Sequence, residues 1–229
     1  MRLLDNHCHL EEIARAGRLE AEQKSAREIG IAGWFSSALS RSEMEWHQQQ
    51  NIPGMKWCAG IHPYYEKSSE SDLDYLAELC ATSRIAAIGE IGLDTRNPDA
   101  EGQKKILLAQ LELADQFDLA VIFHVVKSYY ELYKLIKDNF PKVRGFLHGF
   151  NSSLEVFQAF SEFDIGFSLN ARLPQENVVK EIVERGNWQI ETDAPYALPA
   201  GMKGEYNTLS NLIWVKERIE KIMVRKLWK

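Results

Sequence analysis

Short apolar runs alternate along the chain with longer segments in which apolar residues recur at helical spacing. The short runs have the length of strands, and we expect strands at residues 2–9, 32–38, 55–63, 85–94, 119–125, 144–150, 164–169 and 187–193. The helical spacing predicts helices at residues 19–30, 71–81, 101–117, 128–140, 153–163, 175–186 and 208–223. The pattern therefore predicts strands and helices in alternation.

This order favours one particular α/β architecture. The predicted strands are apolar nearly throughout, as expected when both faces of a sheet are buried. Strict alternation of strands and helices indicates a parallel sheet. Eight such units in 229 residues fit a closed (β/α)8 TIM-type barrel. An open doubly wound sheet is the alternative, but no GxGxxG loop follows the first strand. Since no linker is evident, we expect a single domain over residues 1–229.

Composition and charge exclude some classes of protein. The formal net charge is −6, so the chain is not built as a general polyanion binder with a basic surface. Its three cysteines form no CxxC pair, which suits a reducing compartment. There is no signal-peptide pattern and no run of 18 apolar residues. We expect a cytoplasmic protein without membrane association, and no obligate protein partner is evident.

Histidines and carboxylates gather where the predicted strands end. In a barrel of this type, the active site lies at the carboxyl ends of the strands. Five of the six histidines fall there, and only His47 lies elsewhere. The polar residues that close the strands are His7, His9, His62, Glu90, Asp94, His124, His148 and Asp193. We therefore expect the functional site at this rim.

The first strand carries a His-Cys-His sequence. Residues i and i+2 of a strand point to the same side, so His7 and His9 are expected to face the barrel mouth and Cys8 to face outward. Two imidazoles at this spacing can bind one cation. Taken alone, however, the pattern is more often two ordinary histidines.

Each of the other rim residues also has an alternative interpretation. A buried carboxylate at Glu90 is costly unless it is paired or binds metal, and Arg96 is a candidate partner for a salt bridge. The glycines beside Glu90 favour close approach of a ligand or ion. His124 and His148 could be lone core histidines, and Asp193 could be a turn residue before a proline.

Taken together, these residues are explained by one shared metal centre. Imidazole and carboxylate ligands suit Zn, Mn, Fe, Ni or Co better than a metal that prefers thiolates. Six ligands exceed the needs of one tetrahedral ion, which indicates two adjacent ions.

Six motifs in order, DNHCHL, GIHPYY, AIGEIGLD, FHVV, LHGF and ETDAP, resemble the TatD family of metal-dependent hydrolases. The resemblance runs from Asp5 to about Asn207 and implies one or two divalent ions (Mg, Mn or Zn) per chain. It implies His7, His9, Glu90 and Asp193 as ligands of the first ion, and Glu90, His124 and His148 as ligands of the second. Glu90 and Asp193 would be catalytic, with Asp193 as general base. His62 would bind the substrate phosphate.

The resemblance also implies an activity, namely a deoxyribonuclease or phosphodiesterase that acts from the 3′ end of single-stranded DNA. A divalent ion lowers the pKa of water, so that hydroxide is available near neutral pH. The ions also supply positive potential to an acidic protein. Candidate phosphate contacts near the rim are Arg96, Lys127, Arg172 and Lys203.

Two other functions remain open. One is hydrolysis of another bond, in a small phosphoester, an amide or an aminoacyl-tRNA ester. The other is a non-catalytic barrel that binds metal.

The chain departs from the family pattern in three places. An arginine usually follows the histidine of the fifth strand by two residues, whereas this chain has Val126 and then Lys127. Thr95 replaces an aromatic residue, and the usual asparagine near the C-terminus is not evident. These changes leave the predicted metal ligands intact and bear on substrate preference.

Overall fold

The structure is a computed structural model that describes residues 3–224. Its centre is one sheet of eight parallel strands, and each strand pairs with the next one in the sequence. The predicted parallel sheet is confirmed. The strands are β1 (Leu3–Cys8), β2 (Ile31–Ala38), β3 (Met55–Ala59), β4 (Ala87–Asp94), β5 (Ala120–Val126), β6 (Arg144–Leu147), β7 (Asp164–Leu169) and β8 (Trp188–Ile190).

The sheet closes into a nearly complete barrel where β8 meets β1. Cys8 and Ala194 form an isolated parallel bridge, and the His9 amide donates to the Ala194 carbonyl at 2.7 Å. The Asp193 amide donates to the His7 carbonyl at 2.9 Å. These contacts bring the segment after β8 against the end of β1 at the rim.

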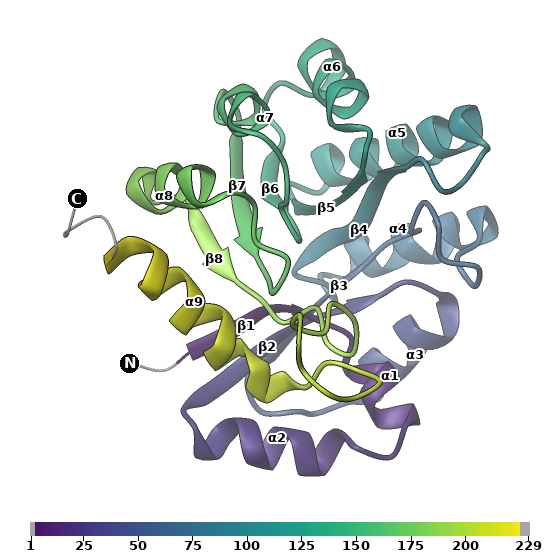
Figure 1. Cartoon of the computed structure of the whole chain (residues 1–229). Coiled ribbons are helices and arrows are strands. Elements are labelled where there is room, and N and C mark those ends of the chain that lie inside the picture. The colour runs from purple at the N-terminus through teal and green to yellow at the C-terminus, as the bar shows by residue number, and fades with distance from the viewer. Residues whose placement is uncertain (1–2, 225–229) are drawn as a thin grey trace.

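Helices surround the strands as an outer layer (Figure 1). They are α1 (Leu10–Arg15), α2 (Leu19–Glu28), α3 (Arg41–Gln49), α4 (Leu73–Ala81), α5 (Ala100–Gln116), α6 (Tyr129–Asn139), α7 (Leu154–Phe160), α8 (Glu176–Arg185) and α9 (Leu212–Val224), with short 3-10 turns at Glu70–Asp72 and Leu209–Asn211. The seven predicted helices are all present. The pattern did not predict α1 and α3, because α1 spans less than two turns and α3 is mostly polar.

The main apolar core lies between the strands and the outer helices. It includes Ile88, Phe123 and Leu147 from the strands and Leu107 and Ile136 from the helices. A second cluster packs α1, α2 and α9 against β1 and β2. A third small cluster of Cys58, Ala87 and Ile122 comes from consecutive strands, and it fills the barrel beneath the rim.

Three strands, β3, β6 and β8, end three or four residues earlier than predicted. Beyond Ala59, the Gly60 amide still donates to the Ala38 carbonyl of β2 at 3.1 Å, but the next two amides bond to side chains. The Ile61 amide donates to Gln110 Oε1 at 2.6 Å, and the His62 amide donates to Ser68 Oγ at 3.1 Å. His62 therefore lies on a loop fixed by side chains, whereas the amides of His148 and Asp193 donate to backbone carbonyls of Phe123 and His7.

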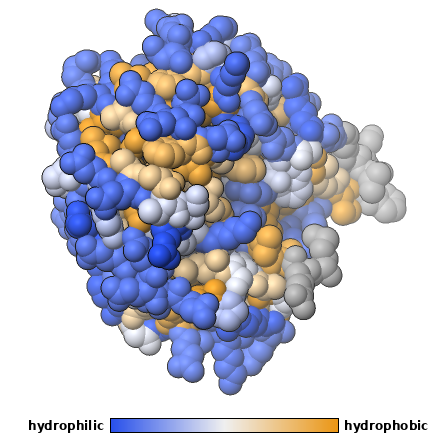
Figure 2. Space-filling view, turned by 180° about the vertical axis from the view of Figure 1, so that it is seen from behind, coloured by the Kyte–Doolittle hydropathy of each residue, from blue (hydrophilic) through white to orange (hydrophobic). Residues whose placement is uncertain are grey.

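Among the helices of residues 3–224, none is long and apolar enough to cross a membrane. The face seen in Figure 2 is covered mainly by hydrophilic residues, with hydrophobic ones in patches between them.

Candidate metal centre

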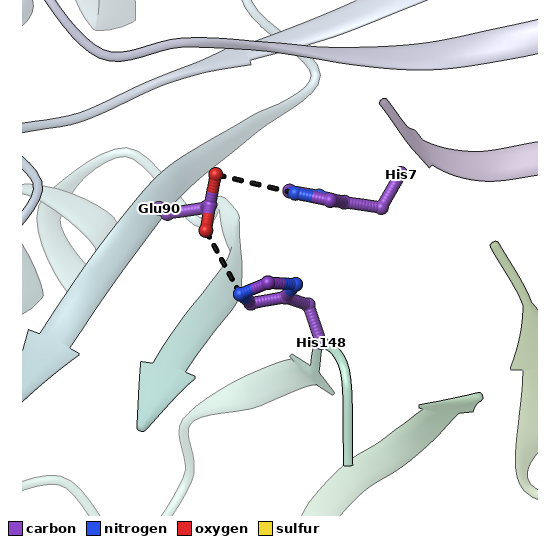
Figure 3. Close-up of side chains that lie close together, drawn as sticks. All are labelled: His7, Glu90 and His148. Atoms are coloured by element: carbon purple, nitrogen blue, oxygen red, sulfur yellow. Dashed lines mark ion pairs between the residues drawn. The ribbon is translucent and has the colours of Figure 1, made fainter. Parts of the chain in front are cut away.

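All six predicted metal ligands converge at the carboxyl ends of the strands. Glu90 of β4 lies between His7 of β1 and His148, which follows β6 (Figure 3). His7 and Glu90 are only 1% and 2% exposed. Three overlapping groups of side chains could each hold an ion: His7, Glu90 and His148; His7, His9 and Asp193; and His62, Glu90 and His124.

The two carboxylate oxygens of Glu90 face different partners. Its Oε1 atom lies 3.2 Å from His7 Nε2 and 3.4 Å from His9 Nε2. Asp193 Oδ1 completes this first group, at 3.7 Å from His7 Nε2 and 3.4 Å from His9 Nε2. Two imidazoles and two carboxylates thus surround one point.

The second group gathers around the other oxygen of Glu90. Its Oε2 atom lies 2.8 Å from His148 Nε2 and 3.3 Å from His124 Nδ1. The two histidine nitrogens are 3.0 Å apart. Glu90 therefore stands between two groups of imidazoles, as expected of a carboxylate that bridges two ions.

The pairing of the strands is irregular at two of the predicted ligands, Glu90 and His7. The pairing of β4 with β5 shifts between Gly89 and Ile91, so Glu90 has no partner in the ladder. The pairing of β1 with β2 likewise shifts between Asp5 and Cys8, a segment that contains His7. An extra residue in a strand bends it and changes where its side chain points. This explains how these ligands can face the barrel mouth.

The glycines beside Glu90, Gly89 and Gly92, lie against β5. A Cβ atom at Gly92 would lie 1.9 Å from the His124 carbonyl oxygen, and one at Gly89 would lie 2.5 Å from the Cβ of Ile122. Both glycines therefore allow β4 to approach β5 closely.

Buried residues hold the outer nitrogens of three histidines. His7 Nδ1 lies 3.3 Å from Ser37 Oγ, His124 Nε2 lies 3.0 Å from Asp94 Oδ2, and His148 Nδ1 lies 3.5 Å from Glu191 Oε1. An acceptor at such a position keeps a hydrogen on the outer nitrogen and leaves the lone pair of the inner nitrogen for a metal. The Asp94 carboxylate has this role at His124, and the Ser37 hydroxyl is able to accept from His7 in the same way. Glu191 is an ion-pair partner of His148 without a hydrogen bond to its Nδ1 atom. The sequence analysis missed Ser37 and Glu191, and it noted Asp94 without a role.

His62 has the opposite arrangement. Its Nδ1 atom accepts hydrogen bonds from the backbone amides of Tyr64 and Tyr65, at 3.0 Å and 2.9 Å. Because Nδ1 is an acceptor, the hydrogen of the neutral ring is on Nε2, the atom 3.9 Å from Glu90 Oε2. His62 therefore offers a donor to the site and not a metal lone pair, although it lies in one of the three possible metal groups.

The donors fit divalent ions. Within residues 3–224, His7 Nε2 and Glu90 Oε1 are buried without a hydrogen-bond partner, a costly arrangement unless something else binds them. Ligand atoms around a tetrahedral ion with bonds of about 2.0–2.1 Å lie roughly 3.3 Å apart. The separations of 3.2–3.7 Å in the first group match that spacing.

Charge coupling in the cluster is strong. Burial acts to lower the pKa of His9, but the carboxylates of Asp193 and Glu90 outweigh it and raise the pKa to about 9. Burial acts to raise the pKa of Glu90, yet the imidazoles of His148 and His7 hold it well below its usual range. For His62, burial and the nearby His124 lower the pKa well below its usual value. The His9 ring thus carries a proton where a cation could bind, while the lowered pKa of His62 keeps that ring neutral.

Asp193 and the residue before it are held by β1. Its φ angle is 57°, a left-handed conformation that costs energy for a residue other than glycine. The buried Asp5 carboxylate accepts from the Thr192 amide at 2.9 Å and from its hydroxyl at 2.6 Å. These bonds, together with that from the Asp193 amide to His7, aim Asp193 at the first group.

A cavity of about 580 Å³ opens above the cluster. Of the four candidate phosphate contacts, Arg96 and Arg172 line it, and Lys127 and Lys203 do not. Arg96 pairs with Asp94 and not with Glu90. Cys8 faces away from the cavity as expected, and packs in the core that includes Leu10 and Ile13.

Comparison with known proteins places the chain in one family. The model of the TatD related DNase family matches residues 4–227, and the chain therefore belongs to this family. "Uncharacterized metal-dependent hydrolase YjjV" of Escherichia coli K12 is 28% identical over 90% of this chain and 84% of that protein. The crystal structure of the E. coli YjjV TatD homologue matches with a TM-score of 0.88 and 26% identity, covering 96% of this chain and 90% of the other.

A further relative has a more specific name. The "3'-5' ssDNA/RNA exonuclease TatD" of Pantoea vagans is 27% identical over 79% of this chain and 74% of its own length. The chain is thus a metal-dependent hydrolase of the TatD family with the predicted TIM-type barrel.

Proposed function

We propose that the protein is a divalent-metal-dependent phosphodiesterase that removes nucleotides from the 3′ end of single-stranded nucleic acid. The observation that carries the proposal is the position of Glu90, with one oxygen at His7 and His9 and the other at His124 and His148. The exonuclease name of the Pantoea relative supports this choice of bond.

The chain offers two ligand sets. His7, His9, Glu90 and Asp193 would hold one ion, and Glu90, His124 and His148 the other. When bound, Mg, Mn or Zn ions would stabilise charge on a phosphoryl oxygen and make water acidic enough to act as a nucleophile near neutral pH. The three cysteines are buried and unpaired, which supports the cytoplasmic location that we propose.

The protein's own side chains would accept a proton from the attacking water and orient the phosphate. Asp193, whose side chain is 15% exposed, accepts the proton of the attacking water at a carboxylate oxygen. His62 donates its Nε2 hydrogen to a non-bridging phosphate oxygen, where negative charge increases in the transition state. Glu90 remains ionised and keeps the two ligand groups together.

The test is stepwise shortening of single-stranded DNA labelled at its 5′ end. Protein loaded with Mn or Mg should produce a ladder of shorter products, and EDTA should abolish it. Asp193→Asn is the control for a contaminating nuclease. If metal-loaded protein leaves DNA and RNA strands intact but hydrolyses a small ester or amide, the proposed bond is wrong.

A further inference from the structure

The mouth of the cavity carries a tyrosine ring stacked on a guanidinium group. The Cζ atom of Arg96 lies 4.3 Å from the centroid of the Tyr64 ring. Tyr64 is 48% exposed, and both residues line the cavity that also contains Glu90 and His124. A flat, half-exposed surface therefore borders the candidate metal centre.

This pair, which we call the ledge, is fixed on both sides. The Tyr64 amide donates to His62 Nδ1 at 3.0 Å. Arg96 Nε donates to both oxygens of Asp94, at 2.9 Å and 3.0 Å. Asn97 Nδ2 donates to the Pro63 carbonyl at 2.7 Å and ties the loop after β4 to the loop after β3. A ligand would bind to a surface that is already ordered, at a small cost in entropy.

The ledge is also tied to the metal centre. The Asp94 carboxylate that holds Arg96 is the one that lies 3.0 Å from His124 Nε2. On the other side, His62 anchors Tyr64 and directs its own Nε2 toward Glu90. One small molecule can therefore place a phosphate beside His62 and a flat group on the ledge.

A cation from another loop lines the same cavity. Arg172 lies in the loop after β7, where its amide donates to Asn170 Oδ1 at 2.9 Å. Arg172 is an exposed residue and forms no salt bridge with another residue of the range 3–224. Loops after the last strands of such barrels often bind phosphate. The cavity of about 580 Å³ has the size of pockets that enclose drug-sized ligands, a size class that includes a mononucleotide.

We propose that the ledge of Tyr64 and Arg96 stacks the base of the terminal nucleotide, and that Arg172 binds phosphate. Aromatic rings and guanidinium planes both stack on nucleobases, and such stacking tolerates any base because each has a π-face. The inference rests on the proposed nucleic-acid phosphodiesterase and names the part of the substrate that the cavity recognises.

The test compares two small ligands, thymidine 5′-monophosphate and 2-deoxyribose 5-phosphate, which differ by the base. We expect calorimetry to show that the metal-loaded protein binds the nucleotide roughly ten- to hundredfold more tightly, the range for stacking of one base. Tyr64→Ala should reduce this ratio to about one, and Tyr64→Phe should preserve it. Arg172→Gln should weaken both ligands by the same factor.

Tyr130→Ala is the matched control, because Tyr130 is a more exposed tyrosine (69%) that does not line the cavity. It should leave the ratio unchanged. If the unsubstituted protein bound the nucleotide and the sugar phosphate equally well, the proposed role of the ledge would be wrong. It would also be wrong if Tyr64→Ala kept the same ratio of the two affinities as Tyr130→Ala.

The outcomes also separate the two proposals. Cleavage of DNA without a base preference in binding would refute only the ledge. A base preference that depends on Tyr64, without cleavage of any strand, would refute the phosphodiesterase and leave the ledge standing.

Discussion

Asp94 Oδ2 lies 3.0 Å from Nε2 of His124, on the opposite side of the ring from Glu90. The other ring nitrogen, Nδ1, lies 3.3 Å from Glu90 Oε2. A carboxylate at the outer nitrogen fixes the tautomer and makes the inner nitrogen a better ligand. We therefore expect Asp94 to prepare His124 as a ligand of a metal ion that Asp94 itself would not contact.

Asp94→Asn should weaken the second metal position by roughly 10- to 100-fold, the usual effect of losing such a partner. The first position should keep its affinity, because its ligands do not contact Asp94. Calorimetric titration of the metal-free protein measures the affinities of both metal positions. Arg96→Gln is the control, since it removes the other partner of Asp94 and leaves the bond to His124. Unchanged affinity in Asp94→Asn would contradict this role.

Glu90→Ala should weaken both metal positions together, because each oxygen of this carboxylate faces one ligand group. His148→Ala should empty mainly the second position. Elemental analysis after gentle purification gives the number of ions per chain in each variant. Equal loss of a single ion in both variants would refute the bridging role of Glu90.

His62→Ala should leave metal content unchanged, because its Nδ1 accepts two backbone amides and its Nε2 carries hydrogen. The rate of cleavage should fall by roughly a hundredfold or more, the usual loss for one donor to a developing anion. His62→Gln, which keeps an N–H donor, should recover part of the rate. A loss of bound metal in His62→Ala would show that His62 is a ligand instead.

Metal affinity should increase with pH. In the metal-free protein, the carboxylates of Asp193 and Glu90 outweigh burial and raise the pKa of His9 to about 9, so this ring is protonated at pH 7. Binding requires a neutral imidazole and must release that proton. Each released proton changes affinity by about tenfold per pH unit, and its contribution disappears above about pH 9.

Titrations between about pH 6 and pH 8.5, in buffers that differ in ionisation enthalpy, measure the number of protons released. His9→Gln should remove one proton from that number. A metal affinity that does not change over this range would contradict the coupling.

The barrel could be predicted because the alternation of apolar strands and amphipathic helices extends along the whole chain. Runs such as residues 119–125 are apolar on both faces, and long amphipathic segments such as residues 101–117 follow them. The six ligand candidates could be identified because histidines are rare here and fall at the strand ends. In contrast, α1 is too short and α3 has too few apolar residues to show the helical spacing of apolar positions.

The remaining parts of the site depend on contacts between distant segments. Glu191 reaches His148 across 43 positions of sequence, and Ser37 reaches His7 across 30. No local pattern marks a serine or glutamate as the outer partner of a histidine. The register shifts at His7 and Glu90 also depend on the neighbouring strands, so alternation within one strand could not reveal them.

The most direct measurement of the central claim is a crystal structure of the Mn- or Zn-loaded protein with anomalous scattering from the metal. We predict two peaks on either side of Glu90. One should be bound by His7, His9, Glu90 and Asp193, and the other by Glu90, His124 and His148, with His62 bound to neither. A single peak without contact to Glu90, or a peak ligated by His62, would contradict a two-metal centre built on this carboxylate.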